Sequence, residues 1–248
     1  MLTADAPRDS LDVLPADVSE VISPNDLMIK SQTREHYFFA GRSALRCIRL
    51  ALLCAAAESP RRILDLPSGH GRVLRTLRAA FPDSEITACD TDRDGVDFCA
   101  AELGAIPVYS HDEPSLIELD GRFDLIWCGS LLTHLPASRW SDFLRFFREH
   151  LEPAGILVFT THGRCVVDRL RSGRYTYGLD EAAVEPLLSE IRSGFGYADY
   201  PGRNGYGISV SLPGWVGSVL AEHEELRLVL YLEKGWNSHQ DVVACMRQ

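Results

Sequence analysis

The chain has 248 residues, 46% of them hydrophobic, which is enough to bury one substantial core with an insertion. Its formal net charge of −10 argues against a broad nucleic-acid surface, which needs a basic face, but leaves room for a narrow basic cleft. The richest apolar run, 44–57, contains two arginines, so we expect no membrane-spanning segment, and the acidic N-terminus lacks a secretory signal pattern.

The seven cysteines fall mostly in apolar stretches and form no Cys-x-x-Cys pair. An odd number suits a reduced cytoplasm better than a disulfide framework. We therefore expect a cytoplasmic protein without a metal site.

The N-terminal quarter is predicted to be a loose arm followed by helices. Residues 1–25 are rich in Asp, Pro and Ser and have no hydrophobic period. Helical patterns run from residue 26 and over 43–57, with an aromatic cluster just before Gly41. Tyr37 in that cluster either packs in the core or closes over a ligand.

A strand, a glycine turn and a helix come next. The stretch 61–66 contains a short apolar run that leads into Asp65. The chain then turns through Gly69 and Gly71 into a helix predicted over 72–81. The helix has arginines on the face opposite its apolar residues, at positions 72, 75 and 78. Because glycine lacks a Cβ and a helix start exposes free N–H groups, this arrangement predicts a nucleotide-type cofactor site.

The second strand, 85–90, ends in Asp90, which lies 19 positions after Gly71 (90 − 71 = 19). This spacing is close to that of a carboxylate that binds ribose hydroxyls. The alternative is an N-cap for the following helix, where Asp is also favoured, and both roles can hold together. A nicotinamide dinucleotide fingerprint would require a third glycine where this chain has Leu74.

Three more strands are predicted with polar residues at their ends. The strand 106–109 precedes His111 and Asp112, and a strand from 123 ends at Ser130. A helix over 138–150 and a turn lead to the strand 156–160, which is followed by His162. Because strand ends face the ligand crevice in an open α/β sheet, these polar residues are candidates for a site.

Taken in order, these segments resemble a known enzyme family. The pattern acid-x-Pro-Ser-Gly-x-Gly, with Pro67 where the family usually has glycine, is followed by Phe-Asp-Leu-Ile, Leu-x-x-His-Leu and Leu-x-Pro-x-Gly-x-Leu. Over about residues 61–162 the chain is similar to class I S-adenosylmethionine-dependent methyltransferases, and more loosely to bacterial enzymes of small-molecule or saccharide biosynthesis. The resemblance implies a Rossmann-like α/β fold with a mostly parallel seven-stranded sheet and an antiparallel last strand beside the fifth.

The resemblance also implies S-adenosylmethionine as the cofactor and N-terminal helices that lie over it. Asp112 matches an acid that meets the adenine amino group, although an exposed turn acid is the alternative. The cofactor-binding residues expected on this basis are Asp65, Pro67, Gly69, Gly71, Asp90, Asp112 and Ser130.

Residues 165–221 are too long for a plain connection between the fifth and sixth strands. They contain an acidic helix predicted over 180–192, a turn-rich run over 202–209, and many glycines and aromatic residues. In the family's fold such a segment sits above the strand ends, so we interpret it as a substrate-binding cap. The alternative is a homodimer interface.

The end of the chain is predicted to be a hairpin of strands over 225–233 and 241–246, and His239 and Gln240 at its turn are expected to be structural. The resulting division is an N-terminal arm with covering helices (1–60), a cofactor-binding core (61–164), a cap insertion (165–221) and a closing hairpin of the core (222–248).

Methyl transfer to oxygen or nitrogen requires orientation of the acceptor and sometimes a base. The candidates are His134 and His162, with His111 as a third. The aromatic cap and acidic charge favour a small or glycosylated acceptor over nucleic acid. Two other hypotheses are a non-catalytic binding module of the same fold and a nicotinamide-dependent reductase.

Overall fold

The computed structural model describes residues 11, 13 and 15–248, so most of the predicted loose arm lies outside the described residues. The described end of the arm, 15–25, is bound to the body of the protein. The guanidinium of Arg75 donates hydrogen bonds to the backbone carbonyls of Ser19 (3.0 Å) and Val21 (2.5 Å). The side chain of Ser23 is buried. This part of the arm is therefore packed rather than loose.

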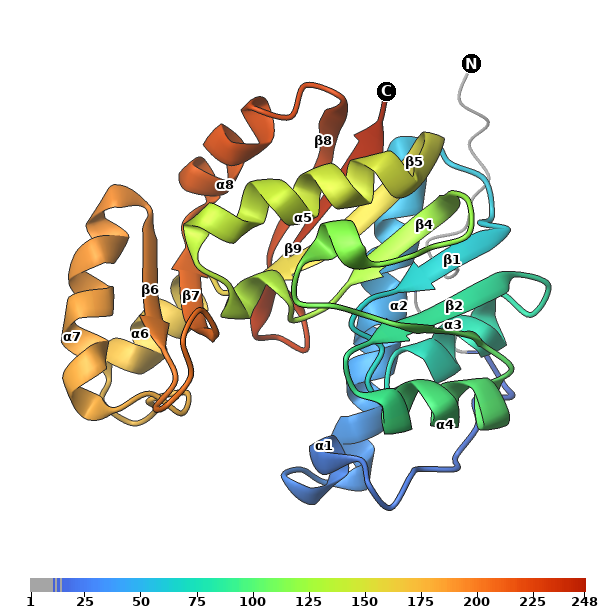
Figure 1. Cartoon of the computed structure of the whole chain (residues 1–248), viewed down its shortest axis with the longest axis horizontal. Helices are drawn as coiled ribbons and strands as arrows, with labels where there is room; N and C mark the ends of the chain where they lie inside the picture. Colours follow the sequence, from blue (N-terminus) through green and yellow to red (C-terminus); the bar gives the residue numbers. More distant parts are fainter. Residues whose placement is uncertain (1–10, 12, 14) are drawn as a thin grey trace.

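A seven-stranded sheet in the order β3-β2-β1-β4-β5-β9-β8 forms the centre of the molecule (Figure 1). Strand β9 is antiparallel to both neighbours, β5 and β8, and the other neighbouring pairs are parallel. The expected mostly parallel sheet, with an antiparallel last strand beside the fifth, is confirmed. The strands are β1 (Arg62–Asp65), β2 (Glu85–Asp90), β3 (Ile106–Tyr109), β4 (Phe123–Cys128), β5 (Leu151–Thr161), β8 (Leu226–Trp236) and β9 (Gln240–Arg247).

Helices cover both faces of this sheet. Successive strand residues point to opposite sides, so an apolar strand presents an apolar surface on each face that needs to be buried. Ile63 belongs to the core under α2 (Arg34–Ala55), α3 (Leu74–Ala80) and α4 (Arg93–Leu103), whereas Leu64 belongs to the core under α5 (Ala137–His150) and α8 (Pro213–Ala221). Strands buried on both faces are expected to be apolar throughout, as 63–64, 125–128 and 156–159 are. The shorter helical segments are α1 (Leu27–Lys30), η2 (Pro114–Leu116), η3 (Leu132–His134) and η4 (Ile191–Ser193).

Two helix predictions were wrong in detail. The stretches before and after Gly41 form one helix, α2, and a Cβ on Gly41 would lie 2.4 Å from the hydroxyl of Thr76 on α3. This glycine therefore permits close helix packing rather than separating two helices. In α3, Arg75 does not face solvent but is 1% exposed, because the N-terminal arm covers it and accepts its hydrogen bonds.

Tyr37 is fully buried and donates a 2.6 Å hydrogen bond to Asp26, which supports the packing interpretation.

Residues 164–211 form a separate lobe beside the sheet (Figure 1). The lobe consists of α6 (Arg164–Arg171), α7 (Glu181–Glu190) and an antiparallel hairpin of β6 (Phe195–Asp199) and β7 (Gly207–Ser211). It has its own core of buried residues, among them Val166, Leu187 and Val210. Helix α8 then returns to the sheet, so the predicted cap interval contains both the lobe and a core helix.

Within the described part of the chain, no helix has the length and apolar character needed to cross a bilayer.

Candidate functional site

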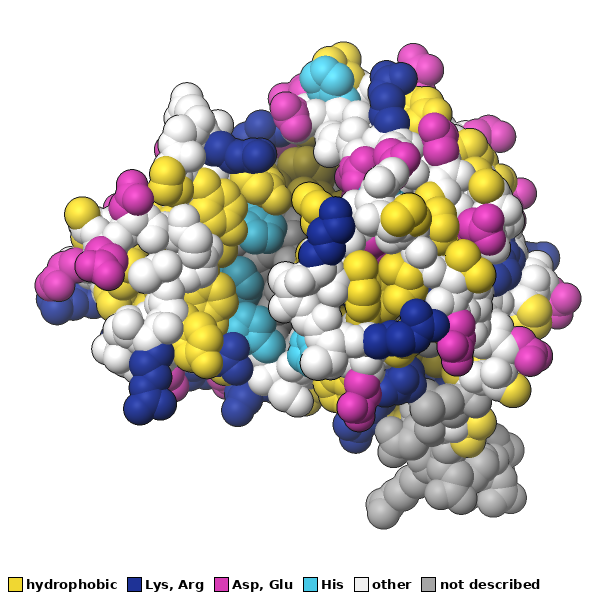
Figure 2. Space-filling view, turned by 90° about the horizontal axis from the view of Figure 1, so that it is seen from below, with side chains coloured by type: hydrophobic (Ala, Val, Ile, Leu, Met, Phe, Trp, Pro, Cys, Tyr) yellow, Lys and Arg dark blue, Asp and Glu magenta, His cyan; other side chains and the backbone are white. Residues whose placement is uncertain are grey.

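The parallel strands end at one edge of the sheet, and the predicted site residues follow those ends. Figure 2 views the molecule from this side and shows a deep hollow between the lobe and the rest of the protein, with histidine side chains along its wall. The site has a half next to β1 and β2 and a half next to β4, β5 and β9.

The glycine turn, residues 66–71, connects β1 to α3 and is tied to β2. The Gly69 N–H donates to the Asp90 carboxylate (2.7 Å), and the Ser68 N–H donates to the Cys89 carbonyl (3.1 Å). Gly69 and Gly71 both have positive φ, at 49° and 74°, as expected for a tight turn. The Leu66–Pro67 peptide bond within this turn is cis.

The two glycines serve different purposes. A Cβ on Gly69 would meet nothing within 4 Å, so this side of the turn is open to a ligand. A Cβ on Gly71 would lie 2.5 Å from a methyl carbon of Leu103 and 3.0 Å from the Cys99 sulfur. Gly71 is therefore required for packing of the turn against α4, whatever its role toward a ligand.

Gly95 is a site-supporting glycine that the sequence analysis missed. It lies in α4, and a Cβ there would be 2.6 Å from the Gly69 carbonyl oxygen. Gly95 thus lets α4 approach the glycine turn closely, much as the third glycine of a dinucleotide fingerprint lets its helix approach the strand. A glycine inside a helix is unfavourable by roughly 1 kcal/mol relative to alanine, which was the available signal that packing requires it.

Asp65, at the end of β1, is 1% exposed, and neither carboxylate oxygen has a hydrogen-bond partner among the described residues. Burial raises the pKa of this carboxyl well above its usual range, and the charge of Asp90 adds to the effect, whereas Arg72 opposes it. A buried carboxylate without a donor is unfavourable. The site is therefore chemically suited to a ligand that brings a cationic N–H donor, as the ammonium of a methionine moiety would.

Asp90 holds the two loops that follow β1 and β2. One oxygen accepts from the Gly69 N–H (2.7 Å), and the other accepts from the Asp92 N–H (2.9 Å). The N-cap of α4 is Asp92, whose carboxylate accepts from the Gly95 N–H at 3.3 Å, so the helix-cap alternative for Asp90 was wrong. The oxygen bound to the Asp92 N–H also accepts a 3.4 Å hydrogen bond from the Thr91 hydroxyl. The other oxygen can accept a second hydrogen bond, which leaves Asp90 able to bind a hydroxyl group.

The remaining predicted residues after β3 and β4 differ in their surroundings. Asp112 and His111 are exposed after β3, and His111 accepts a 2.9 Å hydrogen bond from the Glu113 N–H. Ser130 follows β4 with φ of 63°; its N–H donates to the Thr160 hydroxyl (2.8 Å), and its own hydroxyl accepts from the Gln240 amide (3.1 Å). Ser130 therefore joins the ends of β4, β5 and β9.

His134 and His162 lie together, with ring centroids 6.2 Å apart, and strand β7 of the lobe orients both. The Nδ1 of His134 is 2.8 Å from the Gly207 carbonyl oxygen, and the Nδ1 of His162 is 3.2 Å from that of Ser209. A carbonyl oxygen only accepts, so each Nδ1 carries the proton in its neutral ring. The Nε2 atom of each ring is then left with a lone pair that can take a proton.

Both histidines are held in the neutral form. Burial lowers the pKa of His162 well below its usual value, and the neighbouring His134 and His239 lower it further. Burial also lowers the pKa of His134, against the opposing effect of the Gly207 carbonyl. For His239 burial, with a contribution from Arg169, lowers the pKa to about 4. All three imidazoles are neutral at physiological pH.

Tyrosines complete this half of the site. The ring of Tyr206 stacks on His134 at 5.1 Å, and the Tyr200 hydroxyl lies 3.1 Å from His134 Nδ1. The ring of Tyr177 lies parallel to His239, with centroids 5.6 Å apart, and His239 lies 5.7 Å from His162. We call His134, His162 and His239 the histidine row. Sequence reasoning anticipated an aromatic cap, but it expected His239 to be structural and did not place it beside His162. The only signal for that placement was the predicted position of the closing hairpin beside the fifth strand.

Across the residues that the structure describes, no group of three or more His, Cys, Asp and Glu side chains is arranged to hold a metal ion.

A family profile described as "Methyltransferase domain" matches residues 64–157, from β1 to β5. This segment includes the glycine turn, Asp90, Ser130 and His134. No curated protein sequence matches the chain at a significant level.

Solved structures of similar fold include the following three. An O-methyltransferase family protein from Burkholderia thailandensis shares 16% identity, with 89% of this chain and 62% of that chain covered and a TM-score of 0.50. An S-adenosylmethionine-dependent methyltransferase from Clostridium acetobutylicum ATCC 824 shares 12%, with 90% and 95% covered and a TM-score of 0.58. The N-methyltransferase NodS from Bradyrhizobium japonicum WM9, in complex with S-adenosyl-l-homocysteine, shares 15%, with 96% and 97% covered and a TM-score of 0.52.

The chain thus spans 62% of the length of the Burkholderia protein and nearly all of the other two. At these identities the similarity establishes the fold.

Proposed function

Residues 64–157 match a methyltransferase domain, and S-adenosylmethionine-dependent methyltransferases share the fold. From this premise we propose that the chain is a class I S-adenosylmethionine-dependent enzyme that methylates an oxygen or nitrogen atom of a small-molecule or glycosylated acceptor. S-adenosylmethionine, when bound, supplies an electrophilic methyl group on a sulfonium. The protein then needs to hold the acceptor in line with that methyl, exclude water and, for a protonated acceptor, take a proton.

The half of the site next to β1 and β2 supports the cofactor assignment. Asp65 offers a buried carboxylate with no partner among the described residues, which suits the ammonium of the methionine part. Gly69 opens one side of the turn, and Asp90 has acceptor capacity for a ribose hydroxyl. Pro67, Gly71, Asp112 and Ser130 are further proposed contacts around the cofactor.

The observation that carries the proposed reaction is the pair of neutral imidazoles at the ends of β4 and β5. Their Nδ1–H groups are occupied by the β7 carbonyls, which leaves the Nε2 lone pairs of His134 and His162 as proton acceptors. A depressed pKa keeps these lone pairs free at neutral pH. We assign proton removal to one of the two, and acceptor choice to the lobe that positions both.

The test is turnover. Purified protein is incubated with methyl-labelled S-adenosylmethionine and a panel of phenols, hydroxy acids, amino sugars and amines, while S-adenosylhomocysteine release is measured. We expect release that depends on one class of acceptor. Binding of the cofactor without turnover across the whole panel would instead support the non-catalytic binding module.

A further inference from the structure

The histidine row is adjacent to a hollow of about 440 Å³ that the proposed reaction does not use. Four cationic residues and two acidic ones line it: Arg164, Arg169, Arg174, Lys234, Asp168 and Glu233. We call it the basic hollow. An excess of positive charge is notable here because the chain as a whole has a net charge of −10.

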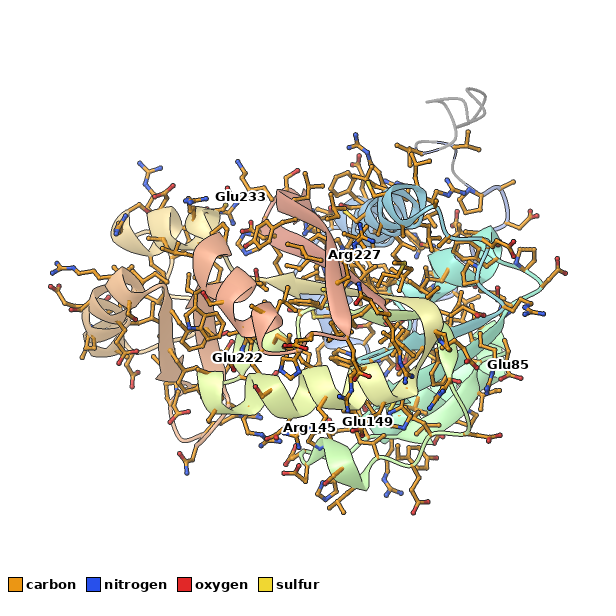
Figure 3. The ribbon with its side chains drawn as sticks, turned by 90° about the horizontal axis from the view of Figure 1, so that it is seen from above. Glu85, Arg145, Glu149, Glu222, Arg227 and Glu233 are labelled. Atoms are coloured by element: carbon orange, nitrogen blue, oxygen red, sulfur yellow. The ribbon has the colours of Figure 1, made fainter. Side chains whose placement is uncertain are left out.

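The acids do not neutralise this excess. Glu233 belongs to β8 and lies at the end of the β8–β9 hairpin next to the lobe (Figure 3), where its carboxylate pairs with Arg164 at 2.5 Å. Asp168 is exposed to solvent and forms no ion pair with a described residue. Within the part of the chain that the structure describes, Arg169, Arg174 and Lys234 also lack a carboxylate partner.

Arg169 is the most informative of these cations because its side chain is half-buried. Its guanidinium lies 5.5 Å from the centre of the Tyr175 ring. Next to it, the buried hydroxyl oxygen of Tyr177 interacts with the Arg169 guanidinium, and the O–H proton has no acceptor among the described residues. A partly desolvated guanidinium with no carboxylate partner among the described residues is suited to an anionic ligand. Both groups can donate hydrogen bonds to the same anion.

The basic hollow is continuous with the proposed proton acceptors. Cys165 on its wall lies 4.0 Å from His239 Nδ1, and Tyr177 stacks on the same imidazole with an interplanar angle of 5°. The His239 ring in turn lies 5.7 Å from that of His162. Figure 2 shows the same relation on the surface: Lys and Arg side chains gather on the lobe at one end of the histidine-lined hollow.

From this arrangement we infer that the basic hollow binds an anionic group of the methyl acceptor, a carboxylate or a phosphate. The neutral tyrosines and histidines then contact the uncharged part of the acceptor and lead its nucleophilic atom toward His162 and His134. This assignment of substrate class rests on the proposed function. It adds a positively charged binding site for the acceptor, which the neutral histidine row cannot provide.

The experiment uses the protein saturated with S-adenosylhomocysteine, whose binding is first measured by calorimetry. Benzoate and phenyl phosphate are then titrated as probes, with benzamide as the neutral counterpart. Arg169→Gln removes the half-buried charge, and Lys234→Gln removes an exposed charge from the same rim. Arg192→Gln is the matched control, because Arg192 is exposed on the lobe but does not line the basic hollow.

We expect at least one anionic probe to bind and benzamide not to bind. Arg169→Gln should lower the affinity for the anion by about tenfold or more, as the loss of a charge-assisted hydrogen bond predicts. The affinity should fall less in Lys234→Gln and should not change in Arg192→Gln. Which probe binds distinguishes a carboxylate from a phosphate.

Equal affinity of the anions for Arg169→Gln and the unaltered protein would overturn the inference, as would the absence of anion binding. Failure of S-adenosylhomocysteine to bind in the first titration would contradict the proposed function instead. In that case the probes are titrated into the free protein, where the same comparison of variants decides the inference.

Discussion

The two halves of the site meet at one sheet edge but are built from opposite chemistry. Beside β1 and β2 the polar groups are carboxylates and backbone N–H groups, with Asp65 buried and lacking a hydrogen-bond partner among the described residues. Beside β4, β5 and β9 they are imidazoles and tyrosines, oriented by the carbonyls of β7. Burial disfavours charge in both halves, raising the pKa of Asp65 and lowering that of His162.

This difference separates two tasks. A buried carboxylate is satisfied only when a cationic ligand arrives, so the first half is suited to binding. A buried neutral imidazole already has a lone pair, so the second half is suited to taking a proton. Mutations in the first half should therefore change affinity for the cofactor, whereas mutations in the second half should change the rate.

The largest effect is expected from the proposed base. His134→Ala and His162→Ala are assayed separately at saturating cofactor, with whichever acceptor the turnover panel identifies. One of the two variants should have a rate about 10²–10⁴-fold lower. Affinity for S-adenosylhomocysteine should remain unchanged in that variant. His111→Ala, an exposed histidine after β3, is the control and should retain full activity. Near-normal turnover in both variants would mean that no histidine base operates at these positions.

Asp65→Asn should have two effects of opposite sign. Loss of the charge should weaken cofactor binding by about 1.5–3 kcal/mol, the range for a charge-assisted hydrogen bond. The free protein should become more stable to heat, because a buried carboxylate with no donor among the described residues is replaced by a neutral amide. Calorimetric titration and thermal unfolding measure the two effects. Asp83→Asn, at an exposed acid, is the control and should change neither quantity. If Asp65→Asn lost stability without losing affinity, Asp65 would have no role in binding the ligand.

The two glycines of the turn should separate packing from binding. Gly71→Ala should lower the free energy of unfolding by about 1–3 kcal/mol, because its Cβ would overlap Leu103 in a positive-φ position. Gly69→Ala has open space for the Cβ and should cost less stability, while weakening cofactor binding. Chemical denaturation and calorimetry on the same two proteins give the comparison. If both alanines affect stability alone, the turn does not contact the cofactor.

The smallest effect is a displacement of the pH profile. The ordinary pKa of a histidine is about 6.5. A base whose pKa is lowered stays unprotonated at pH values somewhat below this, so kcat/KM should stay high there. Activity is lost only as the pH falls through the lowered pKa. The profile is measured from pH 5 to 8 with cofactor affinity checked at each point. A midpoint at or above the ordinary value would show that the base is not one of these buried rings.

The cofactor half could be predicted from the sequence because it is local. Asp65, Gly69 and Asp90 lie within one strand–turn–helix–strand unit, where each strand end and turn has its own pattern of residues. The mostly parallel seven-stranded sheet, with its antiparallel last strand beside the fifth, was implied by the family resemblance. The exceptions arose from tertiary contacts: Arg75 fits a helix surface by its period, but a segment more than 50 positions earlier in the chain covers it.

The acceptor half could be predicted only in outline. His134 and His162 stood out as residues after strands, but their tautomers depend on Gly207 and Ser209, whose backbone carbonyls carry no residue-specific signal. His239 reaches the row because β9 pairs with β5, across a separation of 77 positions (239 − 162 = 77). Such contacts depend on how the lobe and the closing hairpin pack, and no local pattern specifies that.

The central claim is that the carboxylate half binds the cofactor, and calorimetric titration of S-adenosylhomocysteine against Asp90→Ala and Asp92→Ala tests it most directly. Asp90 holds the Gly69 N–H at the open side of the turn, whereas Asp92 caps α4. The unaltered protein should bind one equivalent; Asp90→Ala should lose about 1.5–3 kcal/mol of binding free energy, and Asp92→Ala should keep its affinity while losing about 0.5–2 kcal/mol of stability. Unchanged affinity in Asp90→Ala, or no binding by the unaltered protein, would contradict the claim.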